Sequence, residues 1–509
     1  MTKLTTWKMV CIVFGLCAAT AIASPAQIFT SLPVFNGPNG STPEYMSLVQ
    51  GFDGNFYGTT ISGGGGSCSS GCGEVFRVTP KGTLTVLYSF CKQTDCFDGD
   101  GPSAGLVLGT DGYFYGTTNV GGARQGGTVF KISPGGAVTT LYDFCPPHCA
   151  GAPPAFPQAP LVRAINGSLY GATPSGGYVT CKPIGCGTLF EITSQGALAG
   201  VYRFCAKANC PDGYFPYAGL VQGADESFYG TTFVGGANNA GTVFKVTPNG
   251  SLTTLYSFCS LPNCADGSGP LSGLVQATDG NFYGTAFEGG NSNCGGIGCG
   301  TVFKITPTGA LTTLYTFCSQ LNCVDGSAPY AYLSQATDGN FYGTTSSGGT
   351  DRVDCPGQFA GCGTVFQITQ GGTLTTLHSF SISDGANPRG GLMQATNGTL
   401  YGTTSYGGQP NCLGIPGNSC GTVFSLDMGL GPFVGLVSTA GKVGQTGGIL
   451  GQGFTGTTSV SLNGIPASFT VVSDTFINAT VPAGATTGYV TVATPSGTLT
   501  SNVPFRVLP

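Results

Sequence analysis

The stretch Ala277-Thr-Asp-Gly-Asn-Phe-Tyr-Gly-Thr285 decides the fold, because versions of it recur along most of the chain. Each version contains a Tyr-Gly pair, and successive pairs are 54 to 59 residues apart. The seven tyrosines are Tyr57, Tyr115, Tyr170, Tyr229, Tyr283, Tyr342 and Tyr401. A fixed period of this length is typical of propellers and solenoids, in which one supersecondary unit is repeated.

One repeat unit is clearest between Gly273 and Phe317. Its pattern predicts strands over 273–277, 281–286, 300–306 and 311–317, with tight turns at Asp279-Gly280 and at 307–309. Four antiparallel strands per unit indicate the blades of a propeller. A solenoid is the alternative, but no unit carries a helix signal. We therefore predict an all-β chain containing a seven-bladed β-propeller.

The counts of the strand motifs predict how the propeller closes. The third-strand motif occurs seven times, whereas the fourth-strand motif follows it only six times, because the repeat stops after Phe424. The missing copy lies at the other end of the chain, where residues 29–35 match residues 311–317. We expect this N-terminal strand to complete the last blade and to hide the sheet edges there.

The N-terminus predicts export. Lys3 and Lys8 precede an apolar run over residues 9–22, and Ala21-Ile-Ala23 is a small-residue cleavage site. We expect a signal peptide over 1–23 and a propeller over 27–430. A membrane anchor is the alternative, but about 14 apolar residues are too few to span a bilayer. We therefore expect no membrane insertion after the signal is cleaved.

Composition excludes several function classes. Glycine, with 88 residues, and charged residues at only 8% favour short strands and turns. Removal of Lys3 and Lys8 with the signal leaves 15 basic residues against 22 acidic ones. No basic patch is present, so we expect no nucleic-acid partner.

The cysteines predict a set of disulfides. Of 22 cysteines, 20 remain after removal of the signal, and they form ten close pairs that are gained or lost together between repeats. Such pairing in an exported protein indicates disulfides. Zinc binding is the alternative, but each loop offers two thiols and zinc takes four ligands. The pairs are Cys68 and Cys72, Cys91 and Cys96, Cys145 and Cys149, Cys181 and Cys186, Cys205 and Cys210, Cys259 and Cys264, Cys294 and Cys299, Cys318 and Cys323, Cys355 and Cys362, and Cys412 and Cys420.

The cysteine pairs should all lie on one face. They follow either the second or the fourth strand of a unit, and both loops leave a four-stranded antiparallel blade on the same side. We expect this disulfide-braced face to bind ligands, although the bridges could instead only stiffen loops, each by about 2 kcal/mol.

Candidate catalytic residues are scarce. Most acidic residues belong to Asp-Gly turns, which explains them locally. A second Asp-Gly set follows the fourth strands and could ring a calcium or sugar site, although turn formation also explains it. His378 replaces the tyrosine of the fourth-strand motif, and His148 is isolated in a Cys-bridged loop. The concentrated charges at Asp351, Arg352 and Asp354 depart from the repeat and are the predicted ligand contact, with a solvated loop as the alternative. No cofactor or metal motif is present.

The repeats resemble a known family. Asp338-Gly-Asn-Phe-Tyr-Gly-Thr-Thr345, Gly300-Thr-Val-Phe-Lys-Ile-Thr-Pro307 and Leu252-Thr-Thr-Leu-Tyr-Ser-Phe258 are similar to the Gloeobacter/Verrucomicrobia (GloVer) repeat. The resemblance implies a bacterial, exported, propeller-like protein and carries no biochemical activity with it.

The period disappears after about Gly431, where short strands and turns of sandwich size follow. Residues 464–474 and 480–488 resemble segments of the IPT/TIG immunoglobulin-like fold. This resemblance implies an Ig-like β-sandwich over 431–509 that acts as a spacer or interaction module.

Together these features predict an exported surface or periplasmic protein that binds a glycan or protein ligand without catalysis. An extracellular polysaccharide hydrolase or lyase, with its site on the disulfide-rich face, is one alternative. A purely structural envelope component is the other.

Overall fold

The computed structural model describes residues 27–509 except 66–67, 146–152, 179, 182–183, 194, 291–293, 295, 353–354, 356–359, 409–411 and 413–419. The predicted signal peptide lies outside the described residues. Strands make up most of the regular structure, and the short 3-10 helices lie in loops: η1 (Thr94–Cys96), η2 (Pro262–Cys264) and η3 (Leu321–Cys323). The described chain is therefore all-β, as predicted.

The repeats form seven four-stranded antiparallel sheets within the described residues, and we number them in chain order. The first three are β2 (Val49–Gln50), β3 (Phe56–Thr60), β4 (Glu74–Val78) and β5 (Leu84–Ser89); β6 (Val107–Leu108), β7 (Phe114–Thr118), β8 (Thr128–Ile132) and β9 (Val138–Asp143); and β10 (Val162–Arg163), β11 (Leu169–Thr173), β12 (Thr188–Ile192) and β13 (Leu198–Arg203).

The fourth to sixth sheets repeat this order. They are β14 (Val221–Gln222), β15 (Phe228–Thr232), β16 (Thr242–Val246) and β17 (Leu252–Ser257); β18 (Val275–Gln276), β19 (Phe282–Ala286), β20 (Thr301–Ile305) and β21 (Leu311–Thr316); and β22 (Ser334–Gln335), β23 (Phe341–Thr345), β24 (Thr364–Ile368) and β25 (Leu374–Ser379).

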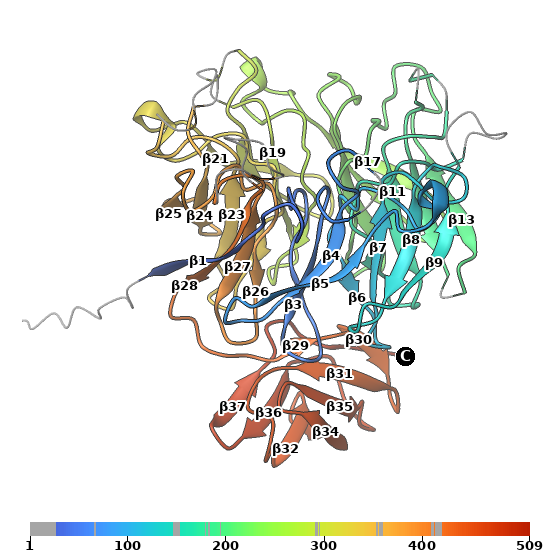
Figure 1. The fold of residues 1–509 in the computed structure, drawn as a ribbon, viewed down its shortest axis with the longest axis vertical. Helices are drawn as coiled ribbons and strands as arrows, with labels where there is room; N and C mark the ends of the chain where they lie inside the picture. The colour runs from blue at the N-terminus through green and yellow to red at the C-terminus, as the bar shows by residue number, and fades with distance from the viewer. Residues whose placement is uncertain are drawn as a thin grey trace, which may run out of the picture.

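The seventh sheet joins the two ends of the repeat region. It contains β26 (Met393–Gln394), β27 (Leu400–Thr404), β28 (Thr422–Asp427) and, at its outer edge, the N-terminal β1 (Ile28–Val34). β1 runs antiparallel to β28, with Phe29 opposite Leu426 and Ser31 opposite Phe424. The strand that residues 29–35 were expected to supply is therefore paired with the last repeat (Figure 1).

Aromatic rings connect each sheet to the next. The phenylalanine after each fourth strand packs edge to face on the central phenylalanine of the following third strand, with centroids 5.1 to 5.3 Å apart. The pairs are Phe35–Phe76, Phe90–Phe130, Phe144–Phe190, Phe204–Phe244, Phe258–Phe303, Phe317–Phe366 and Phe380–Phe424. The contact between the seventh and first sheets, Phe35–Phe76, thus matches those between sheets that follow each other in the chain.

The glycine of the Tyr-Gly pair makes room for this phenylalanine. A Cβ atom added to Gly284 would lie 2.8 Å from Cζ of Phe303, which is opposite Gly284 on the neighbouring strand of the same sheet. The glycine therefore accommodates a ring of its own sheet, and that ring contacts the preceding sheet through Phe258.

The C-terminal region forms two further four-stranded sheets and a two-stranded pair beneath the repeat sheets (Figure 1). One sheet holds β29 (Gly435–Leu436), β31 (Thr446–Leu450), β35 (Phe476–Thr480) and β34 (Phe469–Ser473). The other holds β33 (Ile465–Pro466), β32 (Ser459–Leu462), β36 (Val490–Thr494) and β37 (Gly497–Thr500), and the pair joins β30 (Ala440–Lys442) to β38 (Arg506–Leu508). Both large sheets contribute to one buried cluster that includes Ile449, Val460, Ile477 and Val492.

The C-terminal region contacts the turns of several repeat sheets. Phe476 stacks on Phe52 of the first sheet's turn, with ring centroids 3.9 Å apart. Arg506 pairs with Glu226 in the fourth sheet's turn at 3.0 Å. The backbone N–H of Phe433 donates to the carbonyl of Thr396 in the seventh sheet's turn. The C-terminal region therefore spans the turn side of the repeat sheets.

Candidate functional site

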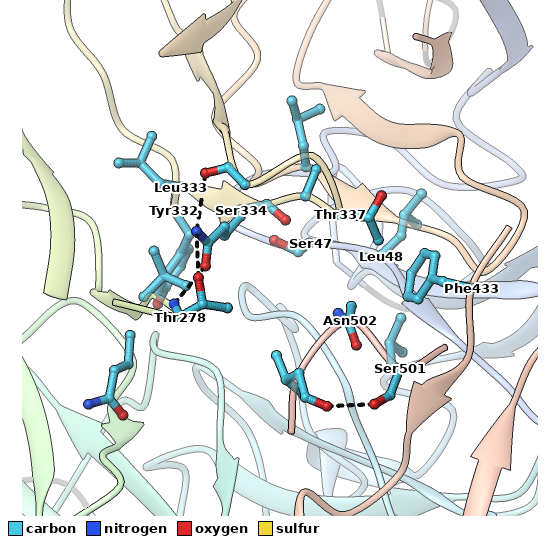
Figure 2. A pocket seen from close by; sticks show the side chains of 18 of the residues that line it. Ser47, Leu48, Thr278, Tyr332, Leu333, Ser334, Thr337, Phe433, Ser501 and Asn502 are labelled. Carbon is cyan, nitrogen blue, oxygen red and sulfur yellow. Dashed lines mark hydrogen bonds between the residues drawn. The ribbon is translucent and has the colours of Figure 1, made fainter. Parts of the chain in front are cut away.

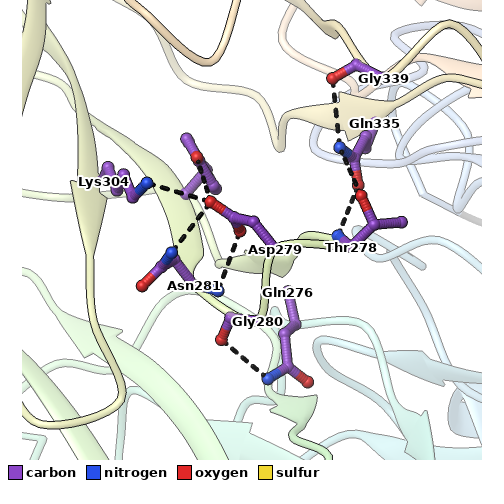
Figure 3. Close-up of polar contacts among 9 residues, drawn as sticks. Gln276, Thr278, Asp279, Gly280, Asn281, Lys304, Gln335 and Gly339 are labelled. Carbon is purple, nitrogen blue, oxygen red and sulfur yellow. Dashed lines mark hydrogen bonds and ion pairs between the residues drawn. The ribbon is translucent and has the colours of Figure 1, made fainter.

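The aspartates of the Asp-Gly turns hold the repeat frame together. In the fifth sheet, Asp279 accepts hydrogen bonds from Tyr283 and Asn281 and pairs with Lys304 at 3.0 Å (Figure 3). Burial alone would raise the pKa of Asp279, but these bonds outweigh it and lower the pKa to about 2. Tyrosine-to-aspartate bonds of the same kind occur at Asp53, Asp111, Asp225 and Asp338. These carboxylates are used for structure.

Glutamines on the first strands clamp neighbouring sheets together. Gln335 accepts a hydrogen bond from the backbone N–H of Thr278, one sheet earlier, at 3.0 Å (Figure 3). The same bond forms at Gln222, Gln276 and Gln394. At the junction of the seventh and first sheets, Gln50 both accepts from the N–H of Thr396 and donates to its hydroxyl. Leu108 and Arg163 stand at this position in the second and third sheets.

The prediction of many disulfides is confirmed. Nine are present in the described residues, and they join nine of the ten predicted pairs. Cys149 lies outside the described residues, so the pair with Cys145 is not described. This number of disulfides indicates an oxidising environment.

Disulfides of neighbouring loops lie close together. Each loop supplies only two thiols, which the prediction from sequence counted against zinc without considering that two loops could bring four sulfurs together. The sulfur atoms of Cys68, Cys72, Cys91 and Cys96 all lie within 4.8 Å of one another, although they form two disulfides. A zinc ion needs thiolates as ligands, and the disulfide-bonded sulfurs do not supply them.

The second Asp-Gly set anchors the Cys-bridged loops. Asp266 accepts hydrogen bonds from the Tyr256 hydroxyl at 2.8 Å and from the backbone N–H groups of Ser260 and Leu261. His378 takes the tyrosine's place in the sixth sheet, with Nε2 3.0 Å from Asp384 and its ring stacked on Phe29. These aspartates fix loop geometry, as the turn interpretation predicted.

The described residues of the predicted ligand contact, Asp351 and Arg352, do not line a pocket. Arg352 donates to the backbone carbonyl of Asn322 in a neighbouring loop, and its side chain is exposed. Asp351 is half-buried, and neither residue lines a pocket described below. Asp354 and His148 lie outside the described residues.

A pocket opens where one segment from each repeat leads into the next sheet. We call this the entry segment; Pro329-Tyr-Ala-Tyr-Leu333 is an example. The residue after the proline varies between repeats, with tyrosine occurring twice: Ser103, Gln158, Tyr217, Leu271, Tyr330 and Arg389, with Glu44 and Tyr45 in the N-terminal copy. All of these except Ser103 and Glu44 line a cavity of about 220 Å³, together with Pro160 and Tyr332. We call this cavity the upper pocket.

Aromatic rings and one ion pair give the upper pocket its chemistry. The guanidinium of Arg389 lies 5.0 Å from the Tyr330 ring centroid and 5.9 Å from that of Tyr45. Its Nη1 donates to Glu44 at 2.7 Å and to the Tyr45 hydroxyl at 3.2 Å. Phe287 packs behind Tyr330 with centroids 4.5 Å apart. The pocket therefore offers aromatic faces beside a charge-compensated polar group.

Burial shifts the ionisation of these groups. It raises the pKa of Tyr45 to about 12, with a further contribution from Glu44. It also raises the pKa of Glu44, and the nearby Arg389 offsets only part of that effect. Burial works against the charge of Arg389, but Glu44 and Tyr45 keep its pKa above the ordinary value. Among the described residues, no group accepts a hydrogen bond from the buried Nε of Arg389.

Large exposed apolar side chains gather around the Cys-bridged loops. Leu321 is 85% exposed and Leu261 51% exposed, and both lie in these loops. Others in loops of the same two classes are Phe97, Tyr178, Ile184, Ile297, Ile382 and Tyr406. These loops lie on the side of the repeat sheets remote from the C-terminal sheets (Figure 1). Exposed apolar groups concentrated on one side are typical of an interaction surface.

A larger cavity of about 980 Å³ lies between the first strands of the repeat sheets and the C-terminal region (Figure 2). Ser334 and Thr337 line it from the repeats, and Phe433, Ser501 and Asn502 from the C-terminal region. We call this cavity the lower chamber. Its lining contains no charged side chain among the described residues.

Sequence reasoning missed the upper pocket, although a signal was present. The entry segments keep their proline and their leucine, while the position after the proline carries a different side chain in almost every repeat. When a fold is built from repeated units, a position that varies between units is not required for the fold. Such positions, gathered at the same end of every unit, are candidates for ligand binding. Tyr217, Tyr330 and Arg389 could have been selected on that basis.

Solved structures similar to the chain have low identity. A candidate 6-phosphogluconolactonase from Bacteroides uniformis is 18% identical, with 66% of this chain and 85% of that chain covered and a TM-score of 0.39. A protein of unknown function from Dyadobacter fermentans is 10% identical, with 79% and 99% covered and a TM-score of 0.41. A luciferin-regenerating enzyme is 12% identical, with 80% and 97% covered and a TM-score of 0.36. These values carry no functional assignment.

No curated protein matches the chain in sequence. Among the described residues, no helix has the length and apolar character needed to cross a bilayer. The model of the Gloeobacter/Verrucomicrobia repeat matches residues 19–208, 179–412 and 298–465, and the protein therefore belongs to the Gloeobacter/Verrucomicrobia repeat family.

Proposed function

We propose that the protein is an exported, non-enzymatic glycan-binding protein whose upper pocket receives the end of a neutral sugar chain. The observation that carries the proposal is the set of divergent entry-segment residues around one pocket in an otherwise repeated frame. Tyrosines dominate this set, and their rings offer apolar faces together with polar hydroxyls.

The chemistry of the pocket favours a neutral sugar. The C–H faces of a sugar ring can pack on Tyr330 and Tyr217, while its hydroxyls can bond to the side-chain amide of Gln158. Glu44 compensates the charge of Arg389, so the pocket has no net charge with which to select an acidic ligand. A volume of about 220 Å³ is below the usual range for drug-sized ligands, which suits a chain end.

The architecture that supports this proposal is a seven-bladed propeller closed by β1. The pairing of β1 with β28, the Phe35–Phe76 contact and the Gln50–Thr396 clamp at the seventh-to-first junction all support a closed ring. Two four-stranded sheets around one core support an Ig-like C-terminal module, named by its resemblance to IPT/TIG domains.

Export is supported by the nine disulfides and by the signal-like N-terminus. Fusing residues 1–26 to a reporter enzyme that works only outside the cytoplasm tests it directly. Reporter activity in intact cells would support export. Production of the fusion without reporter activity in intact cells would contradict it.

Glycan-array binding by the purified, oxidised protein tests the function. A reducing-sugar release assay on the same polysaccharides runs beside it. Binding without release is the expected result. Release would favour a polysaccharide-active enzyme, and silence in both assays would reject a glycan ligand.

A further inference from the structure

Tyr332 lies between the two cavities. Tyr332 lines the upper pocket, of about 220 Å³, and also the lower chamber, of about 980 Å³. Figure 2 shows it at the lower chamber. Pro160 is the other residue that lines both. The ring of Tyr332 therefore forms part of the boundary between a pocket on the loop side and a chamber on the turn side.

The repeat shows that this position normally carries a small residue. Tyr332 is the third residue after the entry-segment proline, and its equivalents are Ser47, Gly105, Pro160, Gly219, Gly273 and Gly391. The repeat sheets do not need a large side chain at this position, because the other entry segments lead into their first strands without one.

The contacts of Tyr332 hold its side chain against the entry segments of neighbouring sheets. The backbone N–H of Gly219, two sheets away, donates to the Tyr332 hydroxyl at 2.6 Å. A Cβ atom added to Gly273 would lie 2.2 Å from Cε1 of Tyr332, and one added to Gly391 would lie 3.3 Å from its Cβ. The ring thus reaches from the sixth sheet's entry segment past the fifth sheet to the fourth, over glycines that leave room for it.

The lower chamber has the chemistry of a site for a neutral, hydroxyl-rich chain. Ser334, Thr337 and Asn502 line it with polar side chains, and Phe433 adds an aromatic ring (Figure 2). The hydroxyl of Ser501 also lies there but donates to the carbonyl of Val503. Its volume of about 980 Å³ lies near the upper end of the range for ligand pockets. The chamber could therefore hold several sugar units if a chain could pass Tyr332.

We infer that Tyr332 determines ligand length: its ring forms the floor of the upper pocket, confines a neutral glycan to its terminal units and keeps the chain out of the lower chamber. This inference rests on the proposed glycan-binding function. Tyr332 is then a specificity-determining residue, and the chamber is the space in which a longer chain would bind if the ring were removed.

The test uses cello-, xylo- and chito-oligosaccharides, each from the monosaccharide to the hexasaccharide, titrated against the oxidised full-length protein. The variants are Tyr332→Gly, which restores the residue of most repeats, and Tyr332→Ser, which copies Ser47 and serves if the glycine variant is poorly folded. Tyr332→Phe is the matched control, because it keeps the ring and removes only the hydroxyl that Gly219 contacts.

For the wild-type protein and Tyr332→Phe, affinity should stop rising at the disaccharide. For Tyr332→Gly or Tyr332→Ser, it should continue to rise, with the tetrasaccharide bound at least tenfold more tightly than the disaccharide. Sugar binding with the same plateau in all variants would overturn the length limit alone. A wild-type affinity that rises to the hexasaccharide would also overturn it. No binding to any series by any variant would reject the proposed function and the inference together.

Discussion

The two cavities of this protein differ in how their linings relate to the repeat. The lower chamber is lined largely by first-strand and turn residues that recur in most units, such as Gln276 and Gln335, and it is covered by the C-terminal region. The upper pocket is lined by entry-segment residues that vary between units, including Gln158, Tyr330 and Arg389. In this protein, repetition marks the residues that build the frame, and divergence at half-buried positions around the pocket marks candidate contacts with a ligand.

Loss of the contact between the C-terminal region and the first sheet's turn should have the largest effect on stability. Phe476→Ala removes a nearly buried ring that stacks on Phe52, and we expect it to cost about 3 to 5 kcal/mol in the free energy of unfolding. Urea unfolding measures this. Val472→Ala is the control, because Val472 is 57% exposed, and it should change stability little. Equal effects of the two variants would mean that the C-terminal region does not brace the turns.

Glu74 tests whether divergence always marks function. It replaces the threonine that begins the third strand in the other repeats, yet it is only 1% exposed, so we assign it to stability. Burial raises the pKa of Glu74 from 4.5 to about 7. The pKa of Glu74 is higher in the folded state than in the unfolded state. The contribution of Glu74 to the free energy of unfolding is therefore fully present below pH 4.5 and is lost as the pH rises to about 7.

The expected loss is about 3 kcal/mol between those limits. Glu74→Thr should remove the contribution of this group, so that the urea midpoint changes less between about pH 5 and about pH 8 than in the wild-type protein. A variant with the same pH dependence as the wild-type protein would contradict this assignment. Sugar binding should be unchanged in Glu74→Thr.

A smaller effect is expected at the junction of the seventh and first sheets. Gln50→Ala leaves the buried N–H of Thr396 without its partner, and we expect a cost of about 2 kcal/mol. Gln222→Ala removes the same kind of bond at an internal junction and should cost a similar amount. Gln370→Ala, at an exposed turn, is the control. A negligible cost for Gln50→Ala beside a clear cost for Gln222→Ala would argue against ring closure.

The sequence predicted the repeated frame because each frame residue recurs. The Asp-Gly turn, the Tyr-Gly pair and the strand phenylalanines each have one local role that is repeated, and the unequal counts of third and fourth strand motifs indicated where β1 would pair. The cysteine pairs were predictable for a similar reason, since partners were present or absent together.

The candidate site was harder to predict, because its residues come from different repeats. Arg389, Glu44 and Tyr330 meet only after the entry segments converge, and nothing local in the sequence pairs them. Arg352 was conspicuous as a charge, yet the structure uses it to join two loops. Tyr332 could not be singled out from the sequence alone. Its role depends on the glycines at the equivalent positions of other repeats, which lie against its side chain only in the folded protein.

The most direct measurement is the affinity of the best array glycan for the wild-type protein, Tyr330→Ala and Phe476→Ala, each with its melting temperature. We predict that Tyr330→Ala binds at least about tenfold more weakly with an unchanged melting temperature. Phe476→Ala should instead lower the melting temperature and keep the wild-type affinity. Unchanged affinity in Tyr330→Ala would contradict the claim that the divergent entry-segment residues form the ligand site.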